Sequence, residues 1–312
     1  MSFHLKTERE AAKLERVLEK REFNSEEELK TFIESLNEAT EPFFEPPLTP
    51  LEQAQELIYD AWETPSRQHR IKLAKKALEL SADCADAYVI LAEDEAESAE
   101  EALRLYEEGV RAGERALGPE TFDQEKGHFW GVVKTRPYMR ARTGLAITLW
   151  DLGRRQEAIA HLWDLLQLNP GDNQGLRYLL INWLMLAGQD EAVSKLVKRY
   201  KEEPRAAWLY PLALWTFRQK GATSVAERRL TLAFLCNPYV VAFLLGAKKM
   251  PKYIPDTYTL GSEEEAIAYL SEGAEVWFKT PSSFQWLGKH LPKFILLLSE
   301  KVAKLENRPL PK

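Results

Sequence analysis

The sequence predicts an all-α protein, a right-handed superhelical solenoid of stacked helical hairpins with a helical arm before it and a helical cap after it. The first observation is a spacing: Pro170, Pro204 and Pro238 are 34 residues apart (204 − 170 and 238 − 204). The second is that apolar residues within each unit recur every three or four positions, which is the spacing of a helix face. The third is that other positions keep the same step: Leu145/Leu179/Ala213, Ala158/Ala192/Ala226 and Leu162/Leu196/Leu230.

A single predicted repeat, residues 139–172, has the local signals of a helical hairpin. Gly153 ends its first helix, because glycine adopts the left-handed backbone of a helix C-terminus at little cost. The second helix carries Ala158 and Leu162 on its apolar stripe and stops before Pro170, which lacks the amide hydrogen that a helix needs. Two helices joined by a short turn pack antiparallel. Because one hairpin cannot bury its apolar faces alone, neighbouring hairpins are expected to stack.

This pattern resembles the tetratricopeptide-repeat (TPR) family, whose 34-residue repeats are helical hairpins. Three positions depart from the family's pattern: Leu165 and Arg199 stand where a small residue is usual, and Pro211 falls inside a first helix. The resemblance predicts a solenoid over residues 51–240, with an insertion at 119–138 that interrupts the period. The predicted repeats are at about 51–84, 85–118, 139–172, 173–206 and 207–240.

The segments on either side of the solenoid are predicted from charge, proline content and periodicity. Residues 1–41 are expected to form a charged helical arm, either solvated or docked as a polar cap. Residues 42–50 contain four prolines and should be a stiff, extended linker. Phe43 and Phe44 in this linker either anchor it on the solenoid or dock in a partner. Residues 241–312 are predicted to be a helical cap.

Composition and charge narrow the class of protein and its compartment. The net charge of −6 at pH 7 does not favour nonspecific binding to nucleic acid. Cys84 and Cys236 lie in different predicted repeats without metal-ligand spacing, so reduced thiols in a reducing compartment are expected. The first residues form no apolar signal region, and the longest apolar runs are too short to cross a bilayer. The sequence therefore predicts a cytoplasmic protein with no membrane partner.

Several longer segments carry a narrower resemblance. They are SADCADAYVILAED at 81–94, KTRPYMRAR at 134–142, NPGDNQGLRYLL at 169–180, and CNPYV at 236–240 with the later GSEEEAIAYL. These segments are similar to bacterial relatives of the suppressor-of-tumorigenicity-seven family, whose proteins are tetratricopeptide-like. The resemblance implies the helical-repeat fold and, for the bacterial members, no established catalytic activity or cofactor. Eukaryotic members are membrane-associated, a property not carried over because this sequence has no spanning segment.

The TPR resemblance also implies a binding surface, because such arrays usually bind extended peptides in a concave groove lined by the first helix of each repeat. Tryptophan offers a large contact area at a low entropy cost, and arginine offers a forked donor for carboxylates. The groove would therefore suit an acidic or C-terminal peptide with apolar anchors. Alternatively, the tryptophans only pack between repeats and the arginines are solvated. The period projects Tyr59, Trp62, Arg140, Thr143, Trp150, Arg177, Ile181, Trp208, Trp215 and Arg218 into the groove.

The insertion and the residues after it, GHFWGVVKTRPYMR, mix aromatic, basic and titratable groups. In a functional interpretation, His128, Arg136 and Tyr138 form one wall of a pocket for an anionic ligand or a peptide end. In a structural interpretation, Phe129 and Trp130 plug a gap between repeats while the arginine bonds exposed helix-end carbonyls. The structural interpretation is favoured, because the two aromatic residues belong to an apolar cluster that continues into two valines.

No catalytic motif accompanies these residues. The five histidines are scattered, and the sequence has no GxSxG, phosphate-loop or dinucleotide fingerprint. The sequence therefore predicts a non-catalytic scaffold that binds a protein or peptide, without a cofactor or metal. An enzyme or ligand-binding protein that uses a pocket at the insertion is one alternative. Another is single-stranded nucleic-acid binding by residues 126–155, where basic and aromatic residues alternate. Pairing between chains through residues 5–36 is also left open.

Overall fold

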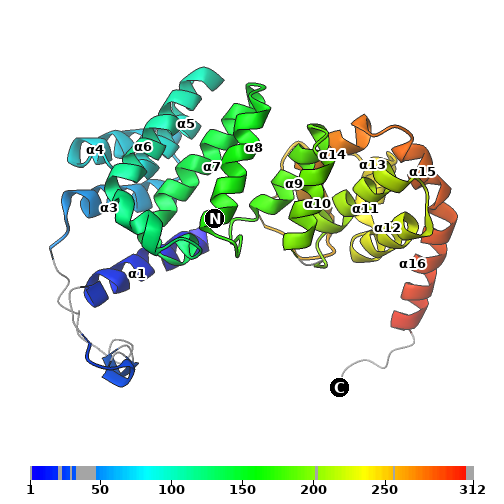
Figure 1. Ribbon diagram of the computed structural model, residues 1–312, viewed down its shortest axis with the longest axis horizontal. Helices are drawn as coiled ribbons and strands as arrows, with labels where there is room; N and C mark the ends of the chain where they lie inside the picture. The colour runs from blue at the N-terminus through cyan, green and yellow to red at the C-terminus, as the bar shows by residue number, and fades with distance from the viewer. Residues whose placement is uncertain are drawn as a thin grey trace. The chain divides into compact units, whose positions relative to one another are not determined.

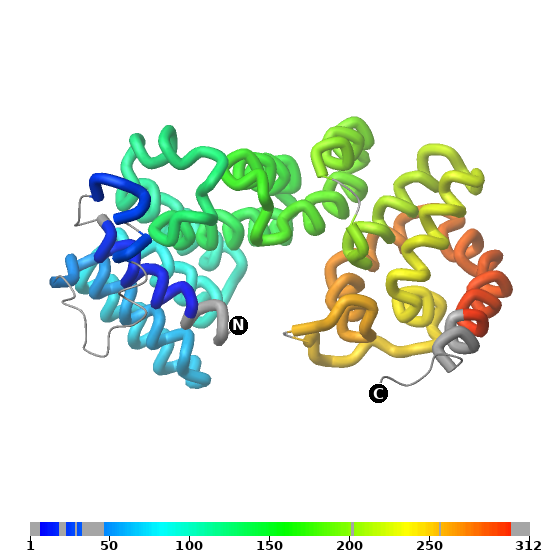
Figure 2. The backbone as a smooth tube through the Cα atoms, turned by 90° about the horizontal axis from the view of Figure 1, so that it is seen from below, coloured from blue at the N-terminus to red at the C-terminus, as the bar shows by residue number. Residues whose placement is uncertain are grey.

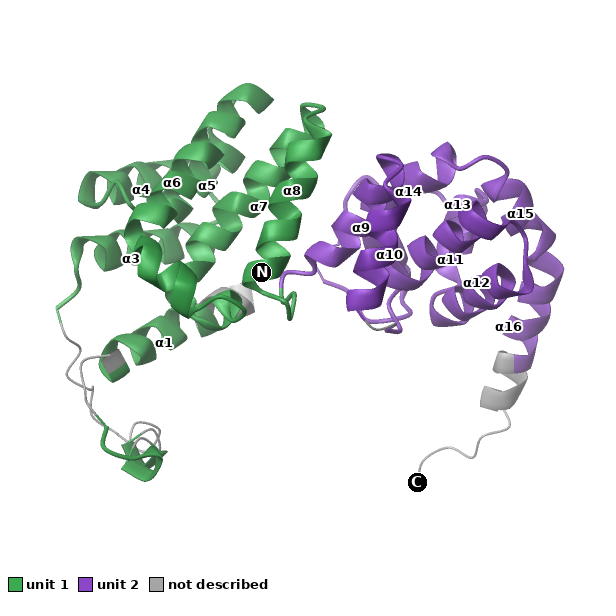
Figure 3. Ribbon diagram, viewed as in Figure 1, with its two compact units in different colours: residues 1–173 green, residues 174–312 purple. Residues whose placement is uncertain are grey.

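The computed structural model contains α- and 3-10 helices and no strand over the residues it describes. The chain forms two compact units, residues 1–173 and residues 174–312 (Figure 3). The helices confirm the predicted all-α class. The superhelical arrangement of the whole chain stays a prediction, and Phe43 and Phe44 of the expected linker lie outside the described residues. The described residues are 2–19, 23–28, 30–32, 47–200, 203–255 and 257–306.

Over its described residues, unit 1 contains three helical hairpins (Figure 1). Each pairs a first helix with a second helix: α3 with α4, α5 with α6, and α7 with α8. Helix α5 also contacts α3 and α7, so these three first helices form a continuous side, called here the first-helix face of unit 1. Their bounds are α3 Pro50–Glu63, α4 Arg67–Leu80, α5 Ala85–Asp94, α6 Ala99–Gln124, α7 Arg136–Asp151 and α8 Arg155–Leu168.

The N-terminal helix α1 (Ser2–Glu19) packs on unit 1. It contacts α3 and the short 3-10 helix η2 (Val133–Thr135) that precedes α7. Figure 2 shows α1 beside α3. The other contact of α1, with η2 before α7, joins segments that are far apart in the sequence. Within the charged arm expected from the sequence, helix α1 is therefore docked on unit 1.

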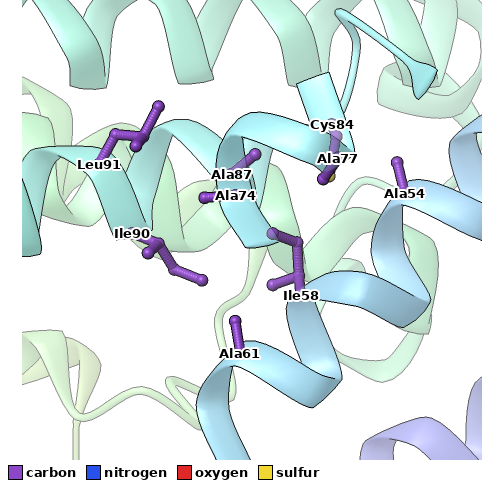
Figure 4. Close-up of a cluster of buried hydrophobic side chains, with 9 residues drawn as sticks. All are labelled: Ala54, Ile58, Ala61, Ala74, Ala77, Cys84, Ala87, Ile90 and Leu91. Carbon is purple, nitrogen blue, oxygen red and sulfur yellow. The ribbon is translucent and has the colours of Figure 1, made fainter. Parts of the chain in front are cut away.

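Small residues let the first hairpins of unit 1 approach closely. Ile58 of α3 and Ile90 of α5 are buried among alanines that line the contacts with α4 (Figure 4). Helices cross at short distances where such small side chains meet. The cluster consists of Ala54, Ile58, Ala61, Ala74, Ala77, Cys84, Ala87, Ile90 and Leu91.

The contact between α6 and α7 depends on glycine. A Cβ atom added to Gly144 of α7 would lie 2.1 Å from Cε1 of the Tyr106 ring on α6. One added to Gly113 of α6 would lie 2.8 Å from Cβ of Tyr138. The two helices therefore meet where no larger side chain fits, and α7 is held in a defined position at the first-helix face.

The predicted insertion, residues 119–138, is largely helical in the structure. Helix α6 continues past a break at Gly118, whose φ of 67° departs from helical geometry, and Pro119 follows it. Two 3-10 turns, η1 (Phe129–Gly131) and η2, then lead directly into α7. Both 3-10 helices contact α7, so the segment fixes the position at which α7 begins.

The described part of unit 2 contains two further hairpins, α9 with α10 and α11 with α12, and four additional helices. Helix α14 packs against both α9 and α11, so it covers the side formed by the first helices of this unit. Helices α15 and α16 pack in sequence after it, and α16 also contacts α12. The bounds are α9 Leu176–Leu186, α10 Asp190–Arg199, α11 Ala206–Lys220, α12 Ser224–Cys236, α13 Tyr239–Leu244, α14 Glu263–Lys279, α15 Ser283–Lys289 and α16 Leu291–Glu306.

Candidate functional site

The candidate site is a pair of arginines on the first-helix face of unit 1. Arg136 and Arg140 are four residues apart on α7, so both side chains leave the same face of the helix. The Arg140 guanidinium donates to both carboxylate oxygens of Asp86 on α5, at 2.8 and 2.6 Å. It also lies over the ring of Trp62 on α3, 4.9 Å from the ring centroid. One guanidinium therefore joins all three first helices.

Asp86 is fully buried, and its carboxylate has a second donor. The side-chain amide of Gln55 on α3 donates to Oδ2 at 2.9 Å. A buried carboxylate is tolerated when a cation and further hydrogen bonds compensate its lost hydration. Asp86 thus fixes Arg140 in place and leaves the rest of the guanidinium available to a second carboxylate.

That second carboxylate belongs to Glu8 of α1. Two guanidinium nitrogens of Arg140 donate to its Oε1 and Oε2 at 2.9 and 3.1 Å, and Arg136 donates to Oε2 at 3.2 Å. Glu8 is 4% exposed, so its carboxylate is nearly removed from water. Arg136 is held from the other side, because its Nε donates to the carbonyl oxygen of Trp130 at 3.0 Å. The site therefore holds the carboxylate of the chain's own helix between two guanidinium groups.

The charges of the site are balanced only while Glu8 is present. Arg136 and Arg140 supply two positive charges against the negative charges of Asp86 and Glu8. Burial by itself would lower the pKa of Arg140, but the carboxylates of Asp86 and Glu8 outweigh it and raise that pKa above its usual value. Without Glu8 the site would keep one uncompensated positive charge. A carboxylate at the position of Glu8 thus balances the charge of the two arginines.

Other contacts of α1 are charged and lie nearer to solvent. Arg9 donates to Glu56 at 2.7 Å and to Asp60 at 3.1 Å, both on α3. The carboxylate of Glu15 accepts a hydrogen bond from the backbone amide of Val133 at 3.0 Å. Partly exposed ion pairs of this kind each contribute little to stability. The buried contact at Glu8 is therefore the principal polar anchor of α1.

A cavity of about 260 Å³ lies beside this anchor, bounded by α1, α3, α6 and the start of α7. Ala12 of α1 faces it, one helical turn from Glu8. Its walls are largely apolar, so the space is suited to a hydrophobic side chain. Apolar and aromatic lining is supplied by Leu51, Tyr59, Leu117, Val133 and Tyr138.

The predicted groove residues of unit 1 are only partly brought together. Tyr59, which is 3% exposed, packs with its ring centroid 6.1 Å from that of Trp62. Trp150 lies further along α7, where Arg155 covers its ring at 5.0 Å. Tyr59 and Trp62 therefore belong to the site around Arg136 and Arg140, and Trp150 does not.

The insertion contributes a buried aromatic ring and not a reactive cluster. Phe129 is fully buried, with ring centroids 5.1 Å from Phe122 and 6.2 Å from Tyr138. For Phe129 this is the packing of the structural interpretation, and Arg136 bonds the carbonyl oxygen of Trp130, whose own side chain is half-buried. His128 precedes η1 and is exposed. No group of three or more His, Cys, Asp or Glu side chains over the described ranges is arranged to hold a metal ion.

The arginines proposed for nucleic acid have acidic partners within the chain. Arg142 donates to Asp164 at 2.6 Å and to Nδ1 of His161 at 3.1 Å. Arg154 pairs with Glu157 at 2.6 Å. With Arg140 also compensated, much of the positive charge of residues 126–155 is already paired inside unit 1.

The predicted groove residues of unit 2 contact unit 2 itself. Trp208 is fully buried, with ring centroids 6.3 Å from Tyr178 and 6.4 Å from Tyr200. Arg177 donates to Glu203 at 2.8 Å. Trp208 therefore makes the packing contacts expected if the tryptophans only pack between repeats.

Two further groove candidates bond neighbouring elements. The indole nitrogen of Trp215 donates to Asp190 at 3.2 Å, and Arg218 donates to the carbonyl oxygen of Met185 at 2.8 Å. Helix α14 covers this side of α9 and α11. Contacts with the unit's own α14 therefore take up part of the first-helix side of unit 2.

Sequence reasoning missed the two carboxylates that complete the site. Asp86 has a weak signal, an acid inside the apolar stretch 85–92. Glu8 has none, because it is one of several acids in a charged helix and its partner Arg140 is 132 residues away. Local patterns find the arginines but cannot choose the carboxylate that they bind.

The fold and the site define an all-helical repeat protein of the TPR-like class, with a carboxylate bound at the first-helix face of unit 1. The family model described as ST7 protein matches residues 38–287. The chain belongs to this family, and the family resemblance predicted from the sequence is confirmed. A bacterial source, which that resemblance also suggested, stays a prediction.

Curated relatives are about twice as long as the matched part of this chain. The human suppressor of tumorigenicity 7 protein-like is 28% identical over 252 residues, covering 73% of this chain and 43% of the relative. The ST7 homolog of Caenorhabditis elegans is 27% identical, covering 81% of this chain and 52% of the relative. The chain spans about half the length of the curated relatives it matches.

One solved structure shows a partial similarity to this chain. It is YrrB, described as a TPR protein with an unusual peptide-binding site, with 19% sequence identity and a TM-score of 0.40. The match covers 65% of this chain and 90% of YrrB. Over the residues that the structure describes here, no helix combines the length and apolar character needed to span a bilayer.

Proposed function

We propose that the chain is a non-catalytic protein-interaction scaffold and that unit 1 binds a carboxylate-bearing segment of a partner protein. The observation that carries the proposal is the buried Glu8 carboxylate held by Arg136 and Arg140. Guanidinium groups bind carboxylates through paired, charge-assisted hydrogen bonds that fix both position and orientation. A surface that already holds a helix in this way has the chemistry to hold another one.

The proposed surface is narrower than the groove expected from the sequence. It consists of Arg136 and Arg140 with the adjoining aromatic residues Tyr59, Trp62 and Tyr138. Aromatic and arginine side chains are the residues that most often dominate protein–protein binding energy. The predicted binding residues of unit 2 are not included, because α14 covers their side of that unit.

Site-directed crosslinking in cells tests this function. A photoreactive amino acid replaces Lys134, which is exposed at the rim of the cavity, in the full chain. We expect it to crosslink to an acidic segment of a partner protein. The same group at Tyr253 of unit 2, which is 86% exposed, is the positional control and should not capture that segment.

An arginine substitution shows whether the capture depends on the site. Arg136→Gln should lower the yield of the Lys134-position crosslink, because it removes one of the two carboxylate donors. Arg111→Gln is the matched control, since Arg111 is exposed on α6 and pairs only with Glu107 and Glu108 among the contacts described. Equal yields from the two variants, or identical proteins captured at the two crosslinking positions, would contradict the proposed surface.

A further inference from the structure

We propose that α1 is a displaceable resident of the site, and that the partner is an amphipathic helix in which an acidic residue precedes a large apolar residue by four positions. This inference rests on the proposed function and specifies the partner that unit 1 takes. It follows from how α1 fits the first-helix face. Helix α1 supplies the carboxylate but leaves the neighbouring apolar space empty.

The fit of α1 is read along one face of the helix. Glu8 and Ala12 are four residues apart, so both point to the same side of α1. Glu8 meets the two arginines, and Ala12 faces the cavity of about 260 Å³. An apolar cavity of about 150 Å³ is large enough to hold benzene. The space opposite Ala12 therefore accepts a leucine or phenylalanine side chain in place of a methyl group.

A helix with that larger side chain would bind more tightly than α1. It would keep the carboxylate contact with Arg136 and Arg140 and also bury apolar surface against Tyr59, Val133 and Tyr138. The ion pairs of Arg9 with Glu56 and Asp60 are partly exposed, and pairs of this kind add little. The acidic residue followed four positions later by a large apolar one is thus the pattern that the site fits best.

Covalent linkage explains how an imperfect ligand stays bound. Residues 20–49 join α1 to α3 in one chain, so α1 binds intramolecularly. A covalent tether raises the effective concentration of α1 at the site above that of a free helix in solution. A weak contact is then sufficient to occupy the site. To displace α1, a partner helix must bind with an affinity high enough to overcome the effective concentration that the linkage gives α1. The side chain that fills the cavity supplies part of that affinity.

Peptide binding to the full chain tests the inference. The probe is a fluorescent peptide with the sequence of residues 2–19, made with Ala12 retained and with Ala12→Leu. We expect the Ala12→Leu peptide to bind about tenfold or more tightly by fluorescence anisotropy, because burying several methylene groups is worth at least that factor. Adding Glu8→Gln to the same peptide should weaken its binding at least about tenfold.

Substitutions within the chain should act in opposite directions on the same probe. Glu8→Gln in the chain weakens its own α1 and should raise the affinity for the Ala12→Leu peptide. Ala12→Leu in the chain fills the cavity and should lower that affinity. Glu10→Gln is the control for charge, because Glu10 is exposed on α1 and pairs with Lys13 of the same helix. It should leave the affinity unchanged.

The outcomes separate the inference from the function on which it rests. If both peptides bind equally and Arg136→Gln weakens both, the carboxylate site is real but the preference for a large apolar residue is wrong. If neither peptide binds even to the Glu8→Gln chain, the site and the proposed function both fail. If light scattering shows that the Glu8→Gln chain dimerises and excludes the peptide, the occupant is a second copy of this chain and the inference is overturned.

Discussion

Arg140 is the residue on which the architecture of unit 1 and its binding chemistry coincide. Its guanidinium bonds Asp86 inside the unit and Glu8 on α1, and it stacks over Trp62. The contact with Asp86 is structural, because that carboxylate is fully buried. The contact with Glu8 is the one that a partner could replace. A substitution at Arg140 therefore affects both folding and binding, whereas one at Arg136 affects mainly binding.

Arg140→Gln should destabilise the chain strongly. Removing one member of a buried ion pair leaves an uncompensated charge, here on Asp86, at a cost of about 3–5 kcal/mol. Urea denaturation of the native and variant chains measures the change. Arg111→Gln on the exposed face of α6 should stay within about 0.5 kcal/mol of the native value. Similar losses for the two variants would show that the buried pair is not a principal support of unit 1.

His161 should make unit 1 less stable in mild acid. Burial, followed by the positive charge of Arg142, lowers the pKa of His161 below its usual 6.5. The neutral ring accepts a hydrogen bond from Arg142 at its Nδ1, which protonation would remove. The unfolded chain takes up this proton first as the pH falls through about 6.5, so stability present above that pH is lost below it.

The urea midpoint of the native chain should therefore fall between pH 7 and pH 5.5 by more than that of His161→Gln. The glutamine side chain does not titrate, and its amide oxygen can still accept from Arg142. Parallel titrations of the two chains at constant ionic strength make the comparison. Identical pH dependence would mean that His161 binds its proton equally well in the folded and unfolded states.

At the scale of helices, the crossing of α6 and α7 sets where the arginines stand. Gly144→Ala would place a methyl group against the Tyr106 ring. Overpacking costs about 1–3 kcal/mol, and the better helix propensity of alanine recovers up to about 1 kcal/mol, so a net loss of about 1–2 kcal/mol is expected by urea denaturation. Gly131→Ala is the control, because an added Cβ atom there meets nothing within 4 Å. If Gly144→Ala leaves the free energy of unfolding unchanged, α6 and α7 can accommodate a methyl group where they cross.

The sequence predicts individual helices well because their signals are local. Gly153 has the expected left-handed φ of 79°, and helix α8 ends at Leu168, two residues before Pro170. The signals do not extend to helices that pack from a distance. Nothing near residue 263 indicates that α14 covers α9 and α11, because that packing depends on apolar faces far apart in the chain.

The same limit explains which part of the candidate site could be predicted. Arg140 and Tyr59 were found because the repeat period fixes which helix face each residue occupies. The carboxylates of Asp86 and Glu8 were missed because a period says nothing about charge pairing between helices. The covered face of unit 2 was missed for the related reason that α14 lies outside the repeats.

At the scale of the whole molecule, the two units cover their first helices in different ways. In unit 2, α14 contributes rings to the core: Tyr269 stacks on Tyr210 at 5.8 Å, and Trp277 is fully buried. In unit 1, α1 is attached through Glu8 and through ion pairs closer to solvent. Segments with few buried apolar contacts open at a lower free energy than core elements. We therefore expect α1 to open at a lower free energy than α14.

Hydrogen exchange followed by mass spectrometry tests this account most directly in the full chain. Without peptide, amides of α1 should exchange at least about tenfold faster than those of α14. Saturating Ala12→Leu peptide, residues 2–19, should accelerate exchange in the chain's own α1 further and protect the start of α7, while α14 stays unchanged. An α1 as protected as α14, or one whose exchange does not respond to bound peptide, would contradict the claim that unit 1 is a carboxylate-binding surface covered by helix α1.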